Sequence, residues 1–445
     1  MRFIIAFLVF FVTIHSFSQE KEQTLTLVPK AHFRTFWMST SYPSEFKNDF
    51  ALGSSLNLGG ELSYQNRLKI QLGYRFWGNL WSSDLNELDP LSGQANRYES
   101  GLFDLLNPKN RFFGKIETLS VSYSKNQWGI TAGRMGIDSD WVNLQDGRLA
   151  PTAIEGINFW VESEKKFKLE FWGIGKMSVR GTSQWLSVGE SIGVFPIGRD
   201  VFGKPSQYFK NTQSKWISIV NLSKSWENFE AKASVTSVQN ISNTFWINGE
   251  HQLLKNSSWV FGAQFGFQHG WGEGGNPDPK LSYKNPEDRN YAVSFRVGYT
   301  KSRLKSNLNF THLGGNGRWL SPREWGKDAW YTFIPRERNE GFSSLNAWTA
   351  YVEYGFSEIG LTPYLHFGLH FLPDISLVEA NKYNFPSYQQ MNLGLKYKPK
   401  SLENLSIHAI IMNKEPLQQS DLNPNQRYNK VGMIHANLIL NWSLN

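Results

Sequence analysis

Hydrophobic and polar residues alternate one by one in many segments of this chain, and this pattern constrains the fold more than any other feature. Within each segment every second residue is apolar or aromatic, and the residues between are mostly polar or glycine. A period of two is typical of a β-strand whose two faces meet different surroundings. The clearest segments are 68–76, 259–268, 293–299, 391–397, 405–411 and 434–442.

Several features favour strands that cross a membrane over the strands of a soluble sandwich. The alternating segments are about 8 to 10 residues long, which suits a tilted strand that crosses a bilayer. Aromatic residues make up 15% of the chain and include 18 Trp, as expected for girdles at two membrane interfaces. A soluble sandwich also alternates, so it remains the alternative. Because lipid tolerates no open sheet edge, a membrane sheet must close on itself.

We therefore predict an all-β fold: one transmembrane, antiparallel, up-and-down β-barrel that forms a single domain. At roughly 24 residues for each strand and its connection, the chain accommodates about 18 strands. Short turns are expected at 64–67 and 398–401. A barrel of this width cannot be filled by strand side chains alone, so loops are expected to fold inward. The long loops are predicted at 77–113, 134–156, 177–215, 269–290, 312–345 and 413–431.

The first residues predict export across the inner membrane. Arg2 is followed by the apolar run 4–12 and then by Ser16 and Ser18, which is the pattern of a signal peptide cut after Ser18. The predicted domains are thus a signal peptide at 1–18 and the barrel at 19–445. The expected location is the outer membrane of a Gram-negative bacterium, with short turns in the periplasm and long loops outside.

Composition limits the partners. The chain has no cysteine, which excludes disulfides, thiolate metal sites and a lipid-anchored lipoprotein. The net charge of +8 is spread along the chain without a basic run. Nucleic acid is therefore not expected as a partner, whereas contact with anionic lipopolysaccharide or passage of anions is. His366 and His370 fall on one strand face, and we interpret them as lumen-lining residues, with no metal and no cofactor expected.

Two of the predicted loops combine arginines with carboxylates and glycines. The first contains Arg134 and the segment 146–156, and the second contains the segments 323–328 and 335–341. Guanidinium groups in a water-filled constriction favour carboxylates or phosphates through bidentate hydrogen bonds. Alternatively, Arg148, Arg336 and Arg338 could form ion pairs that fasten the loops to the barrel wall. The two roles are compatible, because a fastened loop can still line a pore.

At these two loops the sequence resembles the OprD-like family of substrate-specific outer-membrane porins. The matching residues are Asp146, Arg148, Leu149, Pro151 and Gly156 in the first loop and the segments 323–326 and 335–341 in the second. The resemblance implies an 18-stranded barrel, monomeric or loosely trimeric, with a narrow pore. It also implies that arginines, here Arg148, Arg336 and Arg338, guide the carboxylates of amino acids, short peptides or organic acids.

The sequence thus predicts a porin that passes small zwitterionic or anionic solutes by diffusion, without catalysis. The residues predicted to line the substrate pathway are Arg134, Asp146, Arg148, Arg323, Arg336, Glu337 and Arg338. The first alternative is a polysaccharide-binding barrel, a lectin or a capsule-assembly protein. Its sugar-stacking residues would be Trp185, Trp319, Trp325 and Trp330. The second alternative is a barrel hydrolase, although the chain lacks a Gly-x-Ser-x-Gly turn.

Overall fold

The computed structural model describes residues 25–43, 45–145, 147–195, 198–200, 202–253, 258–418 and 422–444. The signal peptide predicted at 1–18 lies outside these described residues. Two short helices occur between strands in this part of the chain, the 3₁₀-helix η2 (Ser100–Leu102) and α2 (Pro424–Arg427). Among the described residues, no helix is both long enough and apolar enough to cross a membrane.

Nearly all regular structure in the described residues is β-strand. The strands are β1 (Leu25–Ser41), β2 (Asp49–Tyr64), β3 (Leu68–Ser82), β4 (Phe112–Lys125), β5 (Trp128–Met135), β6 (Ala153–Glu162), β7 (Phe167–Ser178), β8 (Leu186–Ser187), β9 (Ile217–Ser225), β10 (Phe229–Val238), β11 (Ser242–Gln252), β12 (Trp259–Gly270), β13 (Arg289–Lys301), β14 (Leu304–Gly315), β15 (Leu345–Tyr354), β16 (Leu361–Phe371), β17 (Tyr388–Tyr397), β18 (Leu405–Pro416) and β19 (Met433–Leu444).

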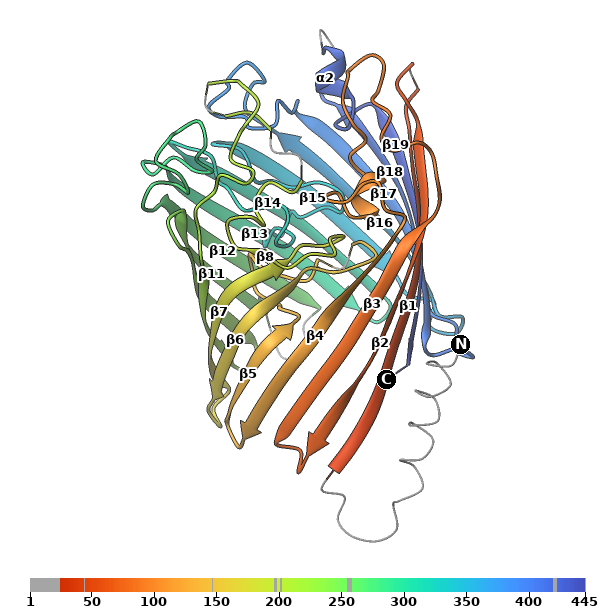
Figure 1. Cartoon of the computed structure of the whole chain (residues 1–445), viewed down its shortest axis with the longest axis vertical. Coiled ribbons are helices and arrows are strands. Elements are labelled where there is room, and N and C mark those ends of the chain that lie inside the picture. The colour runs from red at the N-terminus through yellow and green to blue at the C-terminus, as the bar shows by residue number, and fades with distance from the viewer. Residues whose placement is uncertain are drawn as a thin grey trace.

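The strands form one closed antiparallel barrel (Figure 1). Each long strand pairs with its neighbours in the sequence, and β1 closes the sheet by pairing with β19 from Ala31↔Leu444 to Ser41↔Ile434. The two-residue β8 pairs only with the end of β7, so within the described residues the wall itself has 18 strands. The predicted fold class, an up-and-down barrel of about 18 strands, is confirmed.

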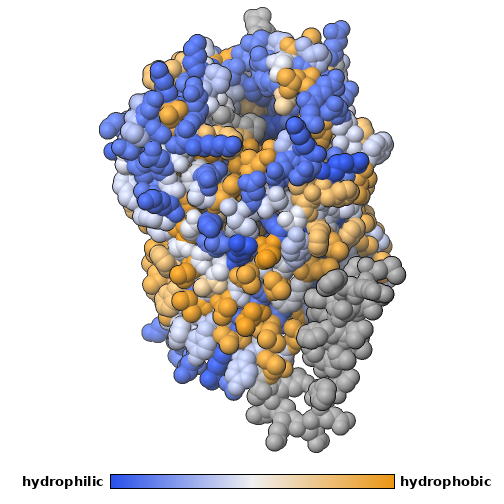
Figure 2. Space-filling view, in the orientation of Figure 1, coloured by the Kyte–Doolittle hydropathy of each residue, from blue (hydrophilic) through white to orange (hydrophobic). Residues whose placement is uncertain are grey.

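The alternation in the sequence separates the outside of the barrel from its lumen. On β3, Ile70, Leu72 and Phe76 are exposed to 41%, 53% and 52% on the outer surface, whereas Arg75 faces inward and is buried. Figure 2 shows hydrophobic side chains gathered over the middle and lower part of the visible face, with hydrophilic residues over the upper end. An apolar outer band of this kind suits the hydrocarbon core of a bilayer.

The long loops all lie at one end of the barrel, and the connections at the other end are short. At the turn end, Gln65 and Asn66 both have positive φ (52° and 54°), and the Arg67 amide donates to the Tyr64 carbonyl at 3.0 Å. Both central residues of a type I′ turn require positive φ, and this turn matches the right-handed twist of a hairpin. Many strands are longer than the sequence indicated, up to 17 residues in β1, because they continue beyond the apolar band.

The six predicted long loops are present at the opposite, loop end of the barrel, with somewhat narrower bounds. They connect the strands at 83–111, 136–152, 179–216, 271–288, 316–344 and 417–432. A seventh long loop, 372–387 between β16 and β17, was not predicted. Its sequence mixes apolar and polar residues without a glycine, so it does not stand out from the strands on either side.

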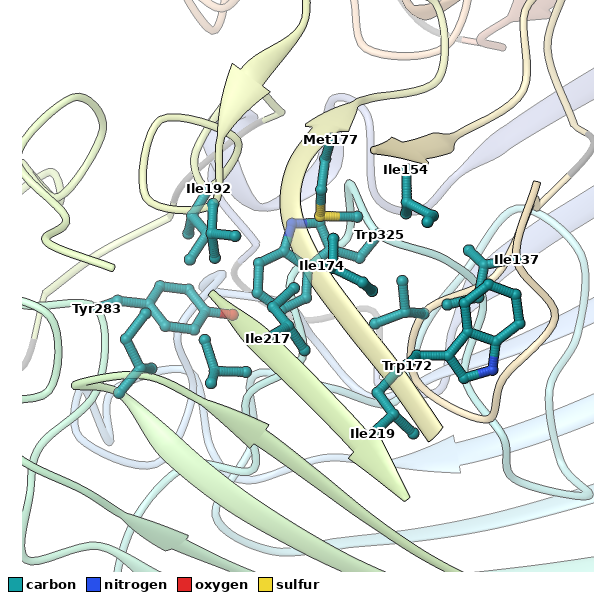
Figure 3. Packing of buried hydrophobic residues seen from close by; sticks show 14 of the residues in the cluster. Ile137, Ile154, Trp172, Ile174, Met177, Ile192, Ile217, Ile219, Tyr283 and Trp325 are labelled. Carbon is teal, nitrogen blue, oxygen red and sulfur yellow. The ribbon is translucent and has the colours of Figure 1, made fainter. Parts of the chain in front are cut away.

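Long loops fold into the lumen and build a hydrophobic core inside the barrel (Figure 3). Inward-facing residues of β7 and β9, such as Ile174 and Ile217, pack there against loop residues Ile137, Ile192 and Trp325. All five side chains are at most 2% exposed. Because burial of apolar side chains is favourable only when they meet each other, this packing fixes the loops against one side of the wall. The polar residues of the same loops are thereby held at defined places in the lumen.

Candidate functional site

Four long loops place six arginines around one small cavity inside the barrel. The cavity has a volume of about 60 Å³, enough for a few water molecules. We call it the arginine cavity. Its lining residues are Arg97 and Tyr98 from loop 83–111, Gln145 and Arg148 from loop 136–152, Arg180 and Phe195 from loop 179–216, and Arg323, Phe333, Arg336, Glu337 and Arg338 from loop 316–344.

Loop 136–152 is tied to the wall by arginines that point inward from the strands. Arg34 of β1 donates through Nη1 to the carbonyl of Arg148 at 2.8 Å. Arg75 of β3 donates to the carbonyl of Leu149 at 3.3 Å, and the Leu149 side chain is fully buried. These bonds fix the backbone at Arg148, whose own side chain lines the cavity.

Glu337 is the acidic centre of the second arginine loop. Its carboxylate contacts Arg97 at 3.2 Å, Arg323 at 3.4 Å and Lys414 of β18 at 2.8 Å. Burial raises the pKa of Glu337, but the charges of Arg97, Lys414 and Arg323 outweigh burial and hold the pKa well below its usual range. Glu337 is therefore ionised and joins three elements of the barrel. Arg323 also pairs with Glu340.

Arg338 has a carboxylate partner of its own. Its guanidinium lies 3.6 Å from the buried carboxylate of Asp328 and donates to the side chain of Gln145. Burial raises the pKa of Asp328 to about 6, and the nearby Arg338 charge offsets this rise only in part. Arg338 thus compensates a buried negative charge while it lines the cavity.

The other three arginines of the cavity have no carboxylate within ion-pair distance among the described residues. Arg148 donates to the carbonyl of Gly147 at 2.8 Å, and its buried Nε has no hydrogen-bond partner. Arg336 donates through Nε to the side-chain carbonyl of Asn437 at 2.7 Å. Arg180 donates to the carbonyl of Arg323. Neutral acceptors satisfy part of the hydrogen-bonding capacity of these guanidiniums, but they leave the positive charges uncompensated.

The pKa values of these three arginines are all lowered. Burial, assisted by the charge of Arg336, lowers the pKa of Arg148 to about 9. Burial also lowers the pKa of Arg336 to about 10 and that of Arg180 well below its usual value, the latter assisted by Arg338 and Arg148. A guanidinium keeps its proton near neutral pH even so, and an anion in the cavity would stabilise these three charges.

Aromatic rings hold several of these guanidiniums without neutralising them. The guanidinium carbon of Arg180 lies 4.0 Å from the ring centroid of Phe195, and that of Arg336 lies 5.5 Å from that of Phe36 on β1. Arg323 lies over Tyr383 at 3.9 Å. A ring face attracts the cation and orients its plane, and the N–H edges remain available to a ligand.

Comparisons with known proteins identify the architecture. No family model and no curated protein matches the sequence. Among solved structures, Pseudomonas aeruginosa OccK9 (OpdG) matches with a TM-score of 0.71 at 14% identity, over 94% of this chain and 98% of that one. Acinetobacter baumannii OccAB2 matches with a TM-score of 0.71 at 13% identity, over 95% and 99%. The chain has the fold of the OprD/Occ porins.

A third structure with this fold is Pseudomonas aeruginosa OpdK with vanillate, which matches with a TM-score of 0.68 at 13% identity. It covers 94% of this chain and 98% of OpdK. The structural neighbours are substrate-specific porins of the outer membrane. The resemblance to the OprD-like family, suggested by two short arginine motifs, is therefore confirmed for the fold over nearly the whole chain.

Within this OprD/Occ fold, most of the residues predicted from the sequence meet at the arginine cavity. Arg148, Arg323, Arg336, Glu337 and Arg338 all line it. Asp146, the sixth of the seven predicted residues, lies outside the described residues.

The seventh predicted residue, Arg134, is not among the residues that line the cavity. It lies on β5 opposite Leu119 of β4, which is 47% exposed on the outer surface, and it pairs with Glu155 of β6 at 2.8 Å. Because adjacent residues in a strand point to opposite sides, a difference of one position decides between the lumen and the outside.

Sequence reasoning missed two arginines of the cavity, Arg97 and Arg180. Neither has a motif around it, so no local signal distinguishes it from other polar loop residues. Both belong to the cavity because loops 83–111 and 179–216 fold inward beside the two arginine motifs.

The histidines and tryptophans singled out in the sequence are part of the interior packing. His366 and His370 share the inward face of β16 as predicted, and His370 stacks on Tyr388 with ring centroids 4.5 Å apart. The described residues contain no group of three or more His, Cys, Asp or Glu arranged to hold a metal ion. Trp319, Trp325 and Trp330 are at most 2% exposed, so they present no surface for stacking on a sugar.

Proposed function

We propose that this protein is an outer-membrane porin that gives small anionic or zwitterionic solutes a passive path through the arginine cavity. The observation that carries the proposal is a set of three guanidiniums, Arg148, Arg180 and Arg336, that line one cavity and have no carboxylate within ion-pair distance among the described residues. The architecture supports it, because structural neighbours over almost the full length are substrate-specific porins.

The chemistry of the lining favours a carboxylate as the recognised group. Guanidinium edges match the two oxygens of a carboxylate and bind them with charge-assisted hydrogen bonds. Glu337 already contacts three cations, so it has little capacity left to bind the ammonium group of a solute. Organic acids, amino acids and short peptides are the solute classes that carry the required group, and vanillate, named with OpdK, is itself a carboxylate.

Passage by diffusion requires that the solute bind and also leave. A site with several alternative partners of moderate strength meets this requirement better than one deep ion pair. The three arginines without a carboxylate partner offer several such contacts in one cavity, and each is already partly satisfied by a carbonyl or an aromatic ring. No chemical step and no cofactor is part of the proposal. The exported chain would begin after the signal peptide and form a monomer or a loose trimer.

The polysaccharide-binding alternative loses support from the structure. Three of the four tryptophans on which it rested are buried in the interior packing, and only Trp185 retains partial exposure. The hydrolase alternative also loses support, because the structural neighbours are channels rather than enzymes.

The proposal is tested by single-channel recording of the chain refolded from residue 19 in a planar bilayer. We expect small discrete conductance steps that benzoate or a short peptide blocks from the loop side. In the double variant Arg148→Gln/Arg336→Gln, block by a carboxylate should weaken by about tenfold or more, because each lost charge-assisted hydrogen bond contributes that order of binding. Block by a neutral sugar of similar size should change much less in this double variant.

Arg338→Gln serves as a contrast to this double variant. It leaves the buried Asp328 without its partner, so the main expected effect is lower barrel stability, with less change in solute preference than in the double variant. A folded barrel that gives no conductance would contradict the porin proposal. Unchanged carboxylate block in the Arg148/Arg336 double variant would remove the arginine cavity from the pathway.

A further inference from the structure

A charged cluster lies on the outer surface of the barrel, away from the arginine cavity. Arg134, Glu155 and Lys176 occupy neighbouring positions on β5, β6 and β7, since Arg134 pairs in register with Glu155 and Glu155 pairs with Lys176. All three side chains are accessible, with exposures of 28%, 32% and 53%. They belong to the outward face because Ile157, two residues after Glu155, is 48% exposed there.

A β-bulge places Lys176 on this outer face. Glu155 pairs with Lys176 while the next residue, Gly156, pairs with Ile174, so Gly175 is the extra residue in β7. Ile174 faces the lumen and is buried, and without the bulge Lys176 would face the lumen as well. A bulge re-aims the side chains that follow it. The local backbone thus brings a second cation beside Arg134 on the outside.

The cluster lies near the loop ends of β5, β6 and β7. Below it on the same outward face lie apolar residues, among them Ile130 on β5 and Phe171 on β7, which are 39% and 40% exposed. A Lys or Arg that faces the bilayer midplane destabilises a barrel by about 2 to 4 kcal/mol, and close to the interface this cost falls to about 0 to 1 kcal/mol. The energetic cost of these three charges is therefore lowest at the level of the outer-leaflet headgroups.

The cluster has two cations and one carboxylate, so it carries a net positive charge. Glu155 accepts from Nε of Arg134 at 2.8 Å and lies 3.7 Å from Nζ of Lys176, so one carboxylate serves two cations. In the described part of the chain, the two terminal nitrogens of Arg134 have no protein acceptor. A further acceptor with negative charge would complete the cluster.

Trp185 holds the guanidinium of Arg134 in a fixed plane. The indole centroid lies 4.7 Å from the guanidinium carbon, and Nε1 of Trp185 donates to the carbonyl of Ile116 on β4 at 3.2 Å. The residues that follow, Leu186 and Ser187 of β8, pair with the end of β7. This segment therefore runs past the ends of β5 and β6 from β4 to β7, and it covers one face of Arg134 while the edge stays open.

We propose that Arg134, Lys176 and Trp185 form a binding site for the phosphate group of an outer-leaflet glycolipid. A phosphate monoester offers three acceptor oxygens and up to two negative charges, which match the open guanidinium edge and the ammonium group. The apolar outer face below the cluster would contact the acyl chains of the same molecule. Glu155 keeps the two cations apart and oriented. The site is independent of the proposed transport function.

Native mass spectrometry of the detergent-solubilised barrel tests this site with lipid A as the probe. The unmodified barrel is expected to retain bisphosphorylated lipid A in preference to the same lipid after phosphatase treatment. The double variant Arg134→Gln/Lys176→Gln should bind the phosphorylated lipid about tenfold or more weakly, because each cation near an anionic headgroup contributes substantially to binding. Lys125→Gln, an exposed lysine at the turn end of β4, is the matched control and should bind normally.

Folding of each variant is checked by its heat-dependent shift in electrophoretic mobility, so that a misfolded barrel is not counted as a loss of binding. Arg134→Lys should restore only part of the affinity, because an ammonium group cannot give the bidentate contact. Equal retention of phosphorylated and dephosphorylated lipid A, or unchanged binding in the folded double variant, would overturn the proposal. Displacement of lipid A by millimolar inorganic phosphate would also overturn it, because the site would then recognise a free anion.

Discussion

A buried carboxyl group close to the arginine cavity couples the cavity to pH. Glu99 at the start of η2 is fully buried and accepts from Thr40 and Asn96, each at 2.6 Å. Burial outweighs these hydrogen bonds and raises the pKa of Glu99 to about 7. The Glu99 charge acts on both Arg148 and Arg336, so its protonation changes the net charge felt in the cavity.

We expect carboxylate block of the channel to be roughly threefold stronger at pH 6 than at pH 8, because protonated Glu99 no longer compensates the arginines. In Glu99→Gln the block at pH 8 should match that of the unmodified protein at pH 6, with little pH dependence left. The measurement is the concentration of benzoate that halves single-channel current at each pH. A pH dependence that persists unchanged in Glu99→Gln would assign it to another group, such as His435, 3.7 Å from Glu99.

The raised pKa of Glu99 also makes the stability of the folded barrel depend on pH. The folded-state pKa of Glu99 lies above the ordinary glutamate value of 4.5, so between these two values the folded barrel holds a proton that the unfolded chain releases. The contribution of Glu99 to stability is therefore complete below about pH 4.5 and is lost as the pH rises through about 7. Removal of the carboxyl group in Glu99→Gln should flatten this part of the stability profile.

At the scale of elements, the inward loops depend on anchors in the wall. Loop 136–152 brings Arg148 to the cavity, and the side chain of Arg34 on β1 binds both the Arg148 carbonyl and Asn441 of β19, at 2.8 Å and 2.6 Å. Arg34 therefore joins a loop to the seam at which the barrel closes. Such an anchor limits the conformations of a loop that would otherwise be mobile.

Arg34→Met should raise single-channel conductance and open-channel noise, because the loop loses an anchor while the apolar part of the side chain is kept. Planar-bilayer recordings compare this variant with Lys30→Met, which removes a cation from the same strand where it pairs with Glu61 and does not contact the loop. Identical conductance in both variants would show that the remaining contacts, including Arg75 to Leu149, hold the loop by themselves.

For the whole molecule, stability depends on the match between the outer face of the barrel and the bilayer. The lipid-facing residues alternate with lumen residues along each wall strand, as on β17, where Leu393 is 51% exposed and its neighbour Asn392 is fully buried. The same alternation gives the molecule its apolar belt and its polar interior. Neither surface could change register without moving charges into lipid.

We expect Leu393→Arg to lower the free energy of unfolding by about 2 to 4 kcal/mol, because Leu393 lies in the middle of a lipid-facing strand. Reversible denaturant titration in lipid vesicles measures this value. Leu393→Ala is the control for the lost apolar surface and should cost clearly less. If the two variants were equally stable, Leu393 would not face hydrocarbon, and the assignment of the outer face would be contradicted at this strand.

Much of the fold could be predicted because its signal is local. The face and approximate number of the strands follow from a period of two, and the turn at Gln65 and Asn66 follows from the short polar segment beside an alternating segment. The candidate site was predicted only where arginines cluster in the sequence. Arg97 and Arg180 carried no such signal. Arg134 lies close to the first arginine motif in the sequence, but its side chain points to the outer surface of the barrel.

The sequence by itself determined the barrel, because each strand contains its own pattern of lipid-facing and lumen-facing residues and lipid permits no open edge. Only the tertiary structure decided which loop residues meet in the lumen. Arg148 and Arg336 are far apart in the chain and converge because their loops pack against the wall and against each other. The bulge at Gly175, which turns Lys176 outward, likewise depends on the register between β6 and β7. Contacts between distant segments leave no local pattern from which they could be predicted.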